Sequence, residues 1–250
     1  MSSLRLCYIE SVIRVDRLTK KFGKLTAVDD LNLTINPGEI FGFIGPNGAG
    51  KTTTIKMLTG VIAPTSGQIE IGGFDLQKNP VAVKKLIGYI PDDPYVYPEL
   101  TGREFLWLVG QLWETKNIGQ KISRLLPIYQ LEQIIDGPFR DYSRGSKQKL
   151  TILAALLHQP QVLVIDEPII GLDPASAQTT TKLFKDFAKQ GGAIFVSTHT
   201  LSVAQDICQR LGVIDQGKLI FEGTIKQLEK QVHGHHDNLE QLFLKLTRHE

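Results

Sequence analysis

The sequence predicts an α/β fold in which a parallel sheet is covered by helices on both faces. Two short uninterrupted apolar runs, 162–165 and 193–196, have the composition of parallel strands that are buried on both sides. Between them, residues 174–189 have a helical pattern long enough for a crossover connection. Strands that alternate with helices in this way predict a doubly wound sheet, whose ligands bind outside the carboxyl ends of the strands.

Further strands are predicted from short apolar runs bounded by turn residues. In chain order these are 12–18, 31–35, 40–44, 68–71, 86–90, 213–215 and 218–221. The first two flank an expected loop that contains Phe22, and the last two form a hairpin around Gln216-Gly217.

Two helical regions complete the assignment. A helical pattern begins at Thr53, directly after the run 40–44 and a glycine-rich segment. Residues 104–157 are mostly helical, with breaks expected at Pro127 and at Gly137-Pro138.

Composition limits the classes of partner and compartment. The 250 residues carry 28 basic and 26 acidic side chains, so the charge balance gives no reason to expect a nucleic acid partner. Cys7 and Cys208 lack the spacing of metal ligands and fit a reducing compartment. No apolar stretch reaches the roughly 18–20 residues of a membrane span, and Glu10 and Arg14 interrupt the N-terminal apolar stretch, against a signal peptide. If the protein serves a membrane, the membrane part is expected on another chain.

The segment after strand 40–44 fits the phosphate-binding template Gly-x4-Gly-Lys-Thr/Ser. It consists of Gly45, Pro46, Asn47, Gly48, Ala49, Gly50, Lys51, Thr52 and Thr53. Glycines let the backbone bend so that successive N–H groups point at one anion, and a following helix N-terminus favours phosphate. Lys51 is expected at the β/γ-phosphates and Thr52 on Mg²⁺. The alternative is a chance glycine-rich turn, but the order of strand, loop and helix favours a nucleotide site.

Polar residues follow two further predicted strands. Asp166 and Glu167 come after 162–165 and, being adjacent, point in different directions. We expect Asp166 to serve the metal through water and Glu167 to polarise a hydrolytic water; the alternative is a capping pair at a surface turn. His199 follows 193–196 and is expected to contact the γ-phosphate, the alternative being a packed core histidine.

Residues 142–150, Tyr-Ser-Arg-Gly-Ser-Lys-Gln-Lys-Leu, resemble the signature motif of ATP-binding-cassette (ABC) ATPases, which usually reads Leu-Ser-Gly-Gly-Gln. Ser143 and Gly145 retain the serine and the second glycine. In physical terms they are an N-cap and a small-residue turn that open an apolar helix, which makes a second anion site. Asp166 follows at the distance expected when one helix joins the signature to the acidic strand.

Other matches strengthen the resemblance, which covers about residues 10–230. Phe22 looks like the aromatic residue that stacks on adenine, although core packing is the alternative. Gly171-Leu172-Asp173 resembles the loop that links the two sites of a dimer, and His199 matches the switch histidine. The resemblance implies a P-loop NTPase (RecA-like) core with a parallel sheet, an antiparallel β subdomain and an inserted helical subdomain at about 100–158. Residues 231–250 are expected to form a linker and a C-terminal helix.

The resemblance also implies a mechanism. Two ABC ATPase subunits, identical or different, join head to tail, and ATP with Mg²⁺ lies between the phosphate loop of one and Ser143/Gly145 of the other. Hydrolysis with Glu167 as base reopens the dimer, and the motion passes to integral membrane permease subunits on separate chains. The protein is then expected to be peripheral, at the cytoplasmic face of the cell membrane.

A single-cassette ABC ATPase outside transport, such as one for iron–sulfur cluster assembly, is the alternative function. Translation-type members usually carry two cassettes, and repair types carry long insertions. Switch GTPases and kinases would lack the signature.

The sequence departs from the family pattern in two motifs, at the usual glutamine position and in the signature. Asp92 stands where glutamine is usual; it can still serve Mg²⁺ or a water, so metal sensing is expected there. Arg144 and Ser146 alter the signature, and Arg144 either adds charge near the γ-phosphate or points to solvent. Segments 92–102 and 239–247 are similar to those of export-type cassettes and favour an exporter. The tract His233-Gly234-His235-His236 is read as a polar linker, with a metal site as the alternative.

Aromatic residues concentrate between positions 95 and 113, where we expect a cytoplasmic helix of a membrane subunit to dock. They are Tyr95, Tyr97, Phe105, Trp107 and Trp113. Phe105 and Leu108 are expected to face inward, whereas Tyr95, Tyr97 and one tryptophan are expected to be exposed.

Overall fold

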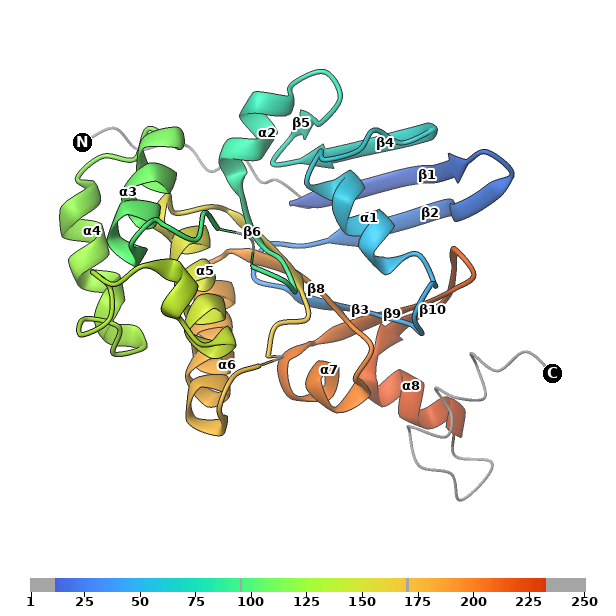
Figure 1. Ribbon diagram of the computed structural model, residues 1–250. Helices are drawn as coiled ribbons and strands as arrows, with labels where there is room; N and C mark the ends of the chain where they lie inside the picture. The colour runs from blue at the N-terminus through green and yellow to red at the C-terminus, as the bar shows by residue number, and fades with distance from the viewer. Residues whose placement is uncertain (1–11, 95, 170, 233–250) are drawn as a thin grey trace.

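The structure, a computed structural model, describes residues 12–94, 96–169 and 171–232. Tyr95, the histidine tract at 233–236 and the helix expected at 239–247 lie outside the described residues. Two β-sheets and the surrounding helices make up the described chain (Figure 1).

The larger sheet contains the strands that carry the predicted site. Its order is β10-β9-β3-β8-β7-β6, and every pair is parallel except β10 with β9. The strands are β3 (Ile40–Ile44), β6 (Ile87–Ile90), β7 (Val162–Asp166), β8 (Ala193–Thr198), β9 (Arg210–Asp215) and β10 (Lys218–Thr224). The predicted parallel core and the hairpin of the last two strands are confirmed.

A second, antiparallel sheet has the order β2-β1-β4-β5. Its strands are β1 (Ile13–Phe22), β2 (Leu25–Ile35), β4 (Ser66–Ile71) and β5 (Phe74–Asp75). The prediction of a long loop between β1 and β2 is wrong. Both strands continue to a tight turn at Gly23, whose φ of +57° suits glycine, because Phe22 pairs with Leu25 across the turn.

Helices cover both faces of the parallel sheet and form a separate group on one side (Figure 1). Around the sheets lie α1 (Lys51–Leu58), α2 (Pro80–Leu86), α6 (Pro174–Lys189), α7 (Leu201–Ile207) and α8 (Ile225–Val232). The side group contains α3 (Gly102–Leu112), α4 (Ile118–Leu125), α5 (Arg144–Leu157) and the 3-10 turns Leu126–Ile128 and Phe139–Asp141. Leu86, predicted to start a strand, is instead the last residue of α2. Pro80, whose fixed φ favours the first turn of a helix, starts this helix, and the strand β6 begins one residue later than predicted.

The helical segment 102–157 breaks at the predicted prolines and also at 113–117. A capping box at Thr101 and Glu104 starts α3. On this helix Leu106 is fully buried, whereas Phe105 and Leu108 are only half-buried. The inward face is therefore one position away from the predicted one, although Phe105 still packs against the core. The domain limits at 100–158 and 231–250 stay predictions.

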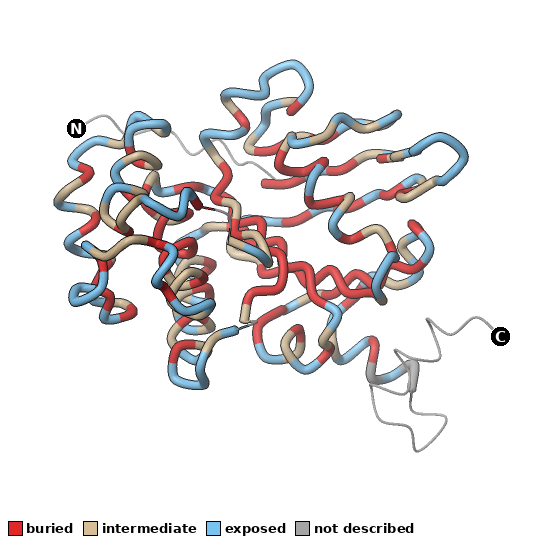
Figure 2. Tube along the Cα trace, in the orientation of Figure 1, coloured by how far each residue is buried: buried red, intermediate tan, exposed pale blue. Residues whose placement is uncertain are grey.

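Two apolar clusters occupy opposite faces of the parallel sheet. On β7, Val162 and Val164 join the cluster with α1 and the antiparallel sheet, whereas Leu163 and Ile165 face the cluster with α5, α6 and α7. This alternation explains why the strand is apolar at every position. Figure 2 shows the buried strands running through the middle of the molecule.

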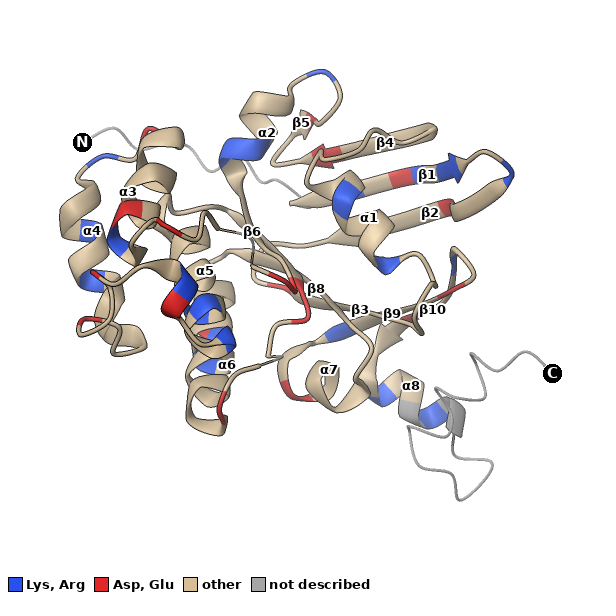
Figure 3. Cartoon of the chain, in the orientation of Figure 1, with Lys and Arg blue, Asp and Glu red and all other residues tan. Residues whose placement is uncertain are grey.

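The described surface mixes both signs of charge, with basic positions along α5 (Figure 3). Among the described helices, none combines the length and the hydropathy that a membrane crossing requires.

Candidate functional site

Three adjacent parallel strands bring the predicted polar residues to one edge of the sheet. The order β3-β8-β7 pairs Ile44 with Thr198, and Asp166 with Ser197. The carboxyl ends of these strands therefore lie side by side, as predicted, with the glycine-rich loop, Glu167 and His199 directly beyond them.

The loop after β3 is held by glycine at positions where a side chain has no room. An added Cβ at Gly45 would lie 2.3 Å from the Ile214 carbonyl oxygen, and one at Gly50 would lie 2.5 Å from that of Ala27. Gly48 and Gly50 have φ values of +82° and +111°, and α1 begins directly afterwards at Lys51. The loop thus presents backbone N–H groups at a helix N-terminus, which is the geometry of an anion site.

Lys51 lies inside this loop. Its ammonium donates to the carbonyl oxygens of Gly45, at 2.6 Å, and Pro46, at 2.9 Å. Burial lowers the pKa of Lys51 below its ordinary value, while the charges of Glu167 and Asp166 oppose that shift. Thr52, next along α1, is exposed.

A hairpin distant in sequence supports the loop, and the sequence analysis missed it. The Gly217 N–H donates to the Ala49 carbonyl at 2.9 Å, and the Gly217 carbonyl accepts from Asp29 at 2.8 Å. Gly217 has a φ of +81°, and an added Cβ would lie 2.9 Å from the Ala27 oxygen. The Gln216-Gly217 dipeptide signals the turn, but no local pattern signals this contact.

Glu167 turns away from Asp166 toward the end of β8. Its φ of +54° is left-handed, unusual for a side chain of this kind. One carboxylate oxygen accepts from His199 Nδ1 at 2.6 Å and from the His199 backbone at 3.0 Å. The other accepts from the Thr198 hydroxyl at 2.9 Å. The adjacent carboxylates therefore point apart, and Thr198 is a site residue that the sequence analysis did not identify.

His199 itself is not a core residue, because 49% of its side chain is exposed. An ionised carboxylate only accepts hydrogen bonds, so Nδ1 carries the proton in the contact with Glu167. The Nε2 atom is the ring nitrogen left for a ligand.

Asp166 is buried at the end of β7. Burial raises the pKa of Asp166 above its ordinary value; the charges of Glu167 and Asp92 add to this, whereas the Ser197 hydroxyl and Lys51 oppose it. Asp92 follows β6 and is half-exposed, and its Oδ1 lies 3.5 Å from Arg144 Nη2. Within the described residues, no group of three or more His, Cys, Asp or Glu side chains has the arrangement of a metal site on its own.

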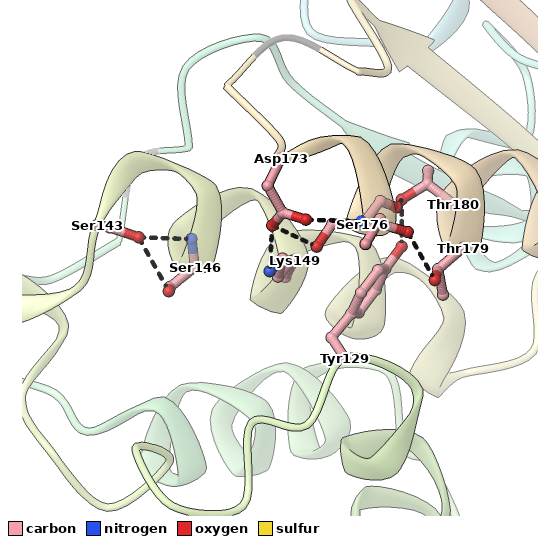
Figure 4. Close-up of polar contacts among 9 residues, drawn as sticks. Tyr129, Ser143, Ser146, Lys149, Asp173, Ser176, Thr179 and Thr180 are labelled. Atoms are coloured by element: carbon pink, nitrogen blue, oxygen red, sulfur yellow. Dashed lines mark hydrogen bonds and ion pairs between the residues drawn. The ribbon is translucent and has the colours of Figure 1, made fainter.

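The signature residues open helix α5, apart from the phosphate loop. The Ser143 hydroxyl accepts from the Ser146 N–H at 3.1 Å and caps the helix (Figure 4). An added Cβ at Gly145 would lie 2.8 Å from the Gly171 oxygen, so glycine allows this turn to pack against the loop 171–173. No hydrogen bond or ion pair of the described residues joins Ser143 or Gly145 to the loop before α1.

Two contacts fasten the helical group to α6, and neither was predicted (Figure 4). Lys149 lies 3.0 Å from Asp173, which caps α6 by accepting from the Ser176 N–H and hydroxyl. These Ser176 bonds, followed by Lys149, hold the pKa of Asp173 well below its ordinary range. The buried Tyr129 and Thr180 hydroxyls are 2.6 Å apart.

Phe22 ends strand β1 with 50% of its surface exposed, which rules out the core alternative. The Lys20 ammonium lies 5.1 Å from the centre of its ring and also donates to the Ala63 carbonyl at 2.6 Å. The β1–β2 hairpin thus presents one solvent-exposed aromatic ring near its tip.

A groove of about 290 Å³ lies between the helical group and the core. Its lining is mainly apolar and aromatic: Thr59, Val61, Lys84, Ile87, Tyr89, Phe105, Val109, Trp113, Thr151, Ala154, Ala155 and His158. Of the aromatic residues expected nearby, Tyr97 and Trp107 are exposed, at 66% and 42%. Trp113 instead stacks on His158.

Comparisons with known proteins identify the family of this chain. The ABC transporter family profile matches residues 28–170, more than half of the chain. The chain is 40% identical over 228 residues to the bacitracin transport ATP-binding protein of Bacillus licheniformis, covering 89% of this chain and 73% of that protein. It is 32% identical over 225 residues to the linearmycin resistance ATP-binding protein of Bacillus subtilis, covering 89% and 72%.

A longer relative and a solved structure complete the comparison. The probable multidrug ABC transporter ATP-binding protein of Escherichia coli is 35% identical over 242 residues, which are 95% of this chain but 42% of that protein. The solved structure of an ATP-binding subunit of an ABC transporter superposes with a TM-score of 0.89 at 30% identity, covering 95% of this chain and all of that one. The chain therefore belongs to the ABC transporter family and is one of its ATP-binding, ATP-hydrolysing proteins.

Proposed function

We propose that this chain is the ATPase subunit of an exporter, and that it works as a head-to-tail dimer on separate membrane subunits. The observation that carries the proposal is the separation of two anion-binding ends. The loop before α1 adjoins Glu167 and His199, whereas Ser143 caps α5 in the separate helical group beside the sheets. Each chain then supplies one half of two shared sites. A homodimer and a heterodimer satisfy this geometry equally.

The direction of transport is inferred from relatives. Their names describe bacitracin transport, linearmycin resistance and Nod factor export. No relative among them is named for iron–sulfur cluster assembly, so the alternative outside transport is set aside.

The residues present fit Mg²⁺ bound together with ATP. The charges of Glu167 and Asp92 both help to raise the pKa of Asp166, and a divalent cation would relieve that like-charge repulsion. Mg²⁺ typically takes one or two protein ligands and completes its shell with phosphate oxygens and waters. Thr52 would bind it directly, Asp166 and Asp92 would act through water, and the ion would neutralise charge on the phosphates.

The chain's own groups can support hydrolysis as follows. Glu167 has four lone-pair positions, of which three are used by Thr198 and His199, so one remains for a water proton. His199 Nε2 donates to the γ-phosphate when the ring carries its second proton. Lys51 turns from the Gly45 and Pro46 carbonyls to the β/γ-phosphates, and Phe22 offers its exposed ring to adenine.

The groove is proposed to receive an amphipathic cytoplasmic helix of the membrane subunit. Its apolar and aromatic lining suits the apolar face of such a helix, and Lys84 would pair with an acidic side chain on it. The groove begins at the C-terminal end of α1, and the phosphate loop lies at the N-terminus of the same helix, so a helix bound in the groove would be connected to the nucleotide site through α1. This partner would place the protein at the cytoplasmic face of the cell membrane.

Mixing two variants tests the head-to-tail site. Lys51→Ala removes the loop cation, and Ser143→Arg obstructs the trans contact, so neither variant alone forms an intact site. A mixed dimer contains one intact site, so we expect ATP-dependent dimers and partial ATPase activity only in the mixture. A mixture that forms no dimer, or no more than either variant alone, contradicts the proposal.

The Lys51→Ala variant also allows a separate prediction about nucleotide affinity and stability. The side chain is buried at the start of α1, but its ammonium bonds loop carbonyl oxygens and does not fill the apolar core, so nucleotide affinity should fall much more than stability. Calorimetry measures the first and thermal unfolding the second. Retained micromolar ATP binding contradicts the role of Lys51.

A further inference from the structure

Two of the positions that depart from the usual family pattern, Asp92 and Arg144, touch each other. Arg144 Nη2 lies 3.5 Å from Asp92 Oδ1, although the residues are 52 positions apart in the chain. Both side chains are accessible, with 61% of Arg144 and 46% of Asp92 exposed. From the sequence alone, Arg144 had two possible directions, toward a phosphate or toward solvent; the structure directs it to Asp92.

Gly171 packs against the stem of Arg144 and holds it in this direction. An added Cβ at Gly171 would lie 3.2 Å from both Cγ and Cδ of Arg144, and Gly171 has a φ of +82°. Gly145, the next residue on α5, packs still more closely on this loop, because an added Cβ there would lie 2.8 Å from the Gly171 carbonyl oxygen. Glycine at 171 therefore leaves a channel for the arginine side chain, which carries its guanidinium to the loop that follows β6.

Asp92 also follows a strand whose end lies beside that of β7. Ile90 of β6 pairs with Ile165 of β7, so Asp92 and Asp166 follow neighbouring strand ends. In agreement with this placement, the charge of Asp92 contributes to the raised pKa of Asp166 and, after burial and the charge of Asp166, to the pKa of Tyr89, which rises to about 12. The contact with Arg144 directs the Asp92 carboxylate to the start of α5.

We propose that Arg144 is a positioning residue for Asp92: it holds the loop after β6 against the N-terminus of α5 and withdraws Asp92 from the metal site. An exposed ion pair of this kind is weak, so binding events can break it. The contact lies within one chain, and α5 also presents Ser143. It therefore links the two surfaces that would face different ATP molecules in the proposed dimer, and this consequence rests on the proposed function.

Hydrogen exchange of the full chain without nucleotide tests the contact directly. The variants are Arg144→Ala, Asp92→Asn, the double variant, and the exchanged pair Asp92→Arg with Arg144→Asp. We expect each single variant to speed exchange in peptides covering 91–100 roughly two- to fivefold, the range for an exposed ion pair. The double variant should add nothing further, and the exchanged pair should restore protection.

Lys85→Ala is the matched control, because it removes an exposed ion pair of 2.7 Å to Glu114, elsewhere in the chain. It should leave exchange in 91–100 unchanged. Unchanged exchange in Arg144→Ala, or effects that add in the double variant, would overturn the proposal.

Magnesium dependence gives a second readout. Arg144→Ala should lower the Mg²⁺ concentration that gives half-maximal ATP binding, and this shift should vanish in the Asp92→Asn background. A shift that persists in that background places Arg144 on the phosphate instead and overturns the proposal. Failure of the dimer itself would appear in the mixing experiment and would leave the nucleotide-free exchange result standing, so the two failures are distinguishable.

Discussion

At the scale of single residues, backbone conformation separates two neighbouring carboxylates. Asp166 is the last residue of β7 and stays buried, whereas Glu167 adopts a left-handed φ of +54° and turns to the end of β8. There Thr198 and His199 hold both of its oxygens. This separation suits the proposed roles, in which Asp166 serves the metal and Glu167 the hydrolytic water.

Glu167→Gln is expected to leave ATP binding nearly intact and to stop turnover. Glutamine keeps the shape and an acceptor oxygen for His199 but does not take a proton from water. Loss of a general base lowers the rate by about 10²–10⁴-fold. ATPase assays measure the rate, and size-exclusion chromatography detects the ATP-bound dimer that should accumulate. A rate near that of the wild type would show that Glu167 is not the base.

The side-chain amide of Gln148 on α5 is buried without hydrogen bonds to the described residues. The residue is 1% exposed, and neither its amide nitrogen nor its oxygen has a hydrogen-bond partner within the described residues. Leaving a buried polar group unpaired costs about 1–3 kcal/mol, so Gln148→Met, of similar length, should raise the free energy of unfolding. Urea unfolding measures it.

Thr180→Val is the matched control for Gln148→Met. This change also removes a buried polar group, but one that is paired with the Tyr129 hydroxyl at 2.6 Å. It should therefore lower stability, because Tyr129 loses its partner. If Gln148→Met also lowers stability, Gln148 is satisfied in solution.

At the scale of elements, helix α5 serves a different purpose at each end. Ser143 caps its start, and His158 ends it, where the ring stacks on Trp113 at 5.0 Å and Nε2 donates to the Ile87 carbonyl at 3.0 Å. The same helix thus carries a proposed phosphate contact and a wall of the groove, about fourteen residues of rigid α-helix apart.

The histidine end of α5 predicts a pH dependence of stability. Burial lowers the pKa of His158 below its ordinary value of 6.5. In the described chain, Nδ1 has no hydrogen-bond acceptor that would stabilise the doubly protonated ring. Below pH 6.5 the unfolded chain therefore binds more protons than the folded chain, so stability falls as the pH falls. His158→Gln keeps a donor for Ile87 and should flatten this part of the curve. Urea titrations between pH 5 and 8 measure it, and identical slopes would contradict the assignment.

At the scale of the whole molecule, the groove joins the helical group to the nucleotide-binding core. A partner held between the two would be affected whenever they move relative to each other. Tyr97 is exposed near the start of this helical group and is available to such a partner.

Tyr97→Asp is expected to separate the cassette from its membrane partner. A charge at an exposed aromatic anchor opposes burial at an interface, whereas the free cassette keeps its core. The isolated variant should stay folded with basal ATPase activity, while the co-expressed membrane subunit should be lost during purification. Ile220→Asp, at an exposed apolar position on β10, is the control and should retain the partner. Full co-purification and stimulated ATPase with Tyr97→Asp would place docking elsewhere.

The sequence by itself determined the chemistry that lies within short segments. The loop 45–53, the acidic end of β7 and the histidine beyond β8 were all predicted, because strand, turn and functional side chain are covalent neighbours. The crossover helix α6 was predicted with the bounds that it has in the structure. Boundaries set by pairing, such as the long β1–β2 hairpin, were not, because a cross-strand partner overrides local turn preferences.

Tertiary structure alone decided the contacts between segments that are far apart in the chain. It placed Gly217 under the phosphate loop, Arg144 on Asp92 and Lys149 on Asp173. It also formed the groove from α2, β6, α3, α5 and the segment after α1. Strand order and helix packing set these pairings, and many orders are compatible with the same run of strands and helices. A residue's chemistry can be read from its neighbours in sequence, but its partner depends on which elements the fold makes adjacent.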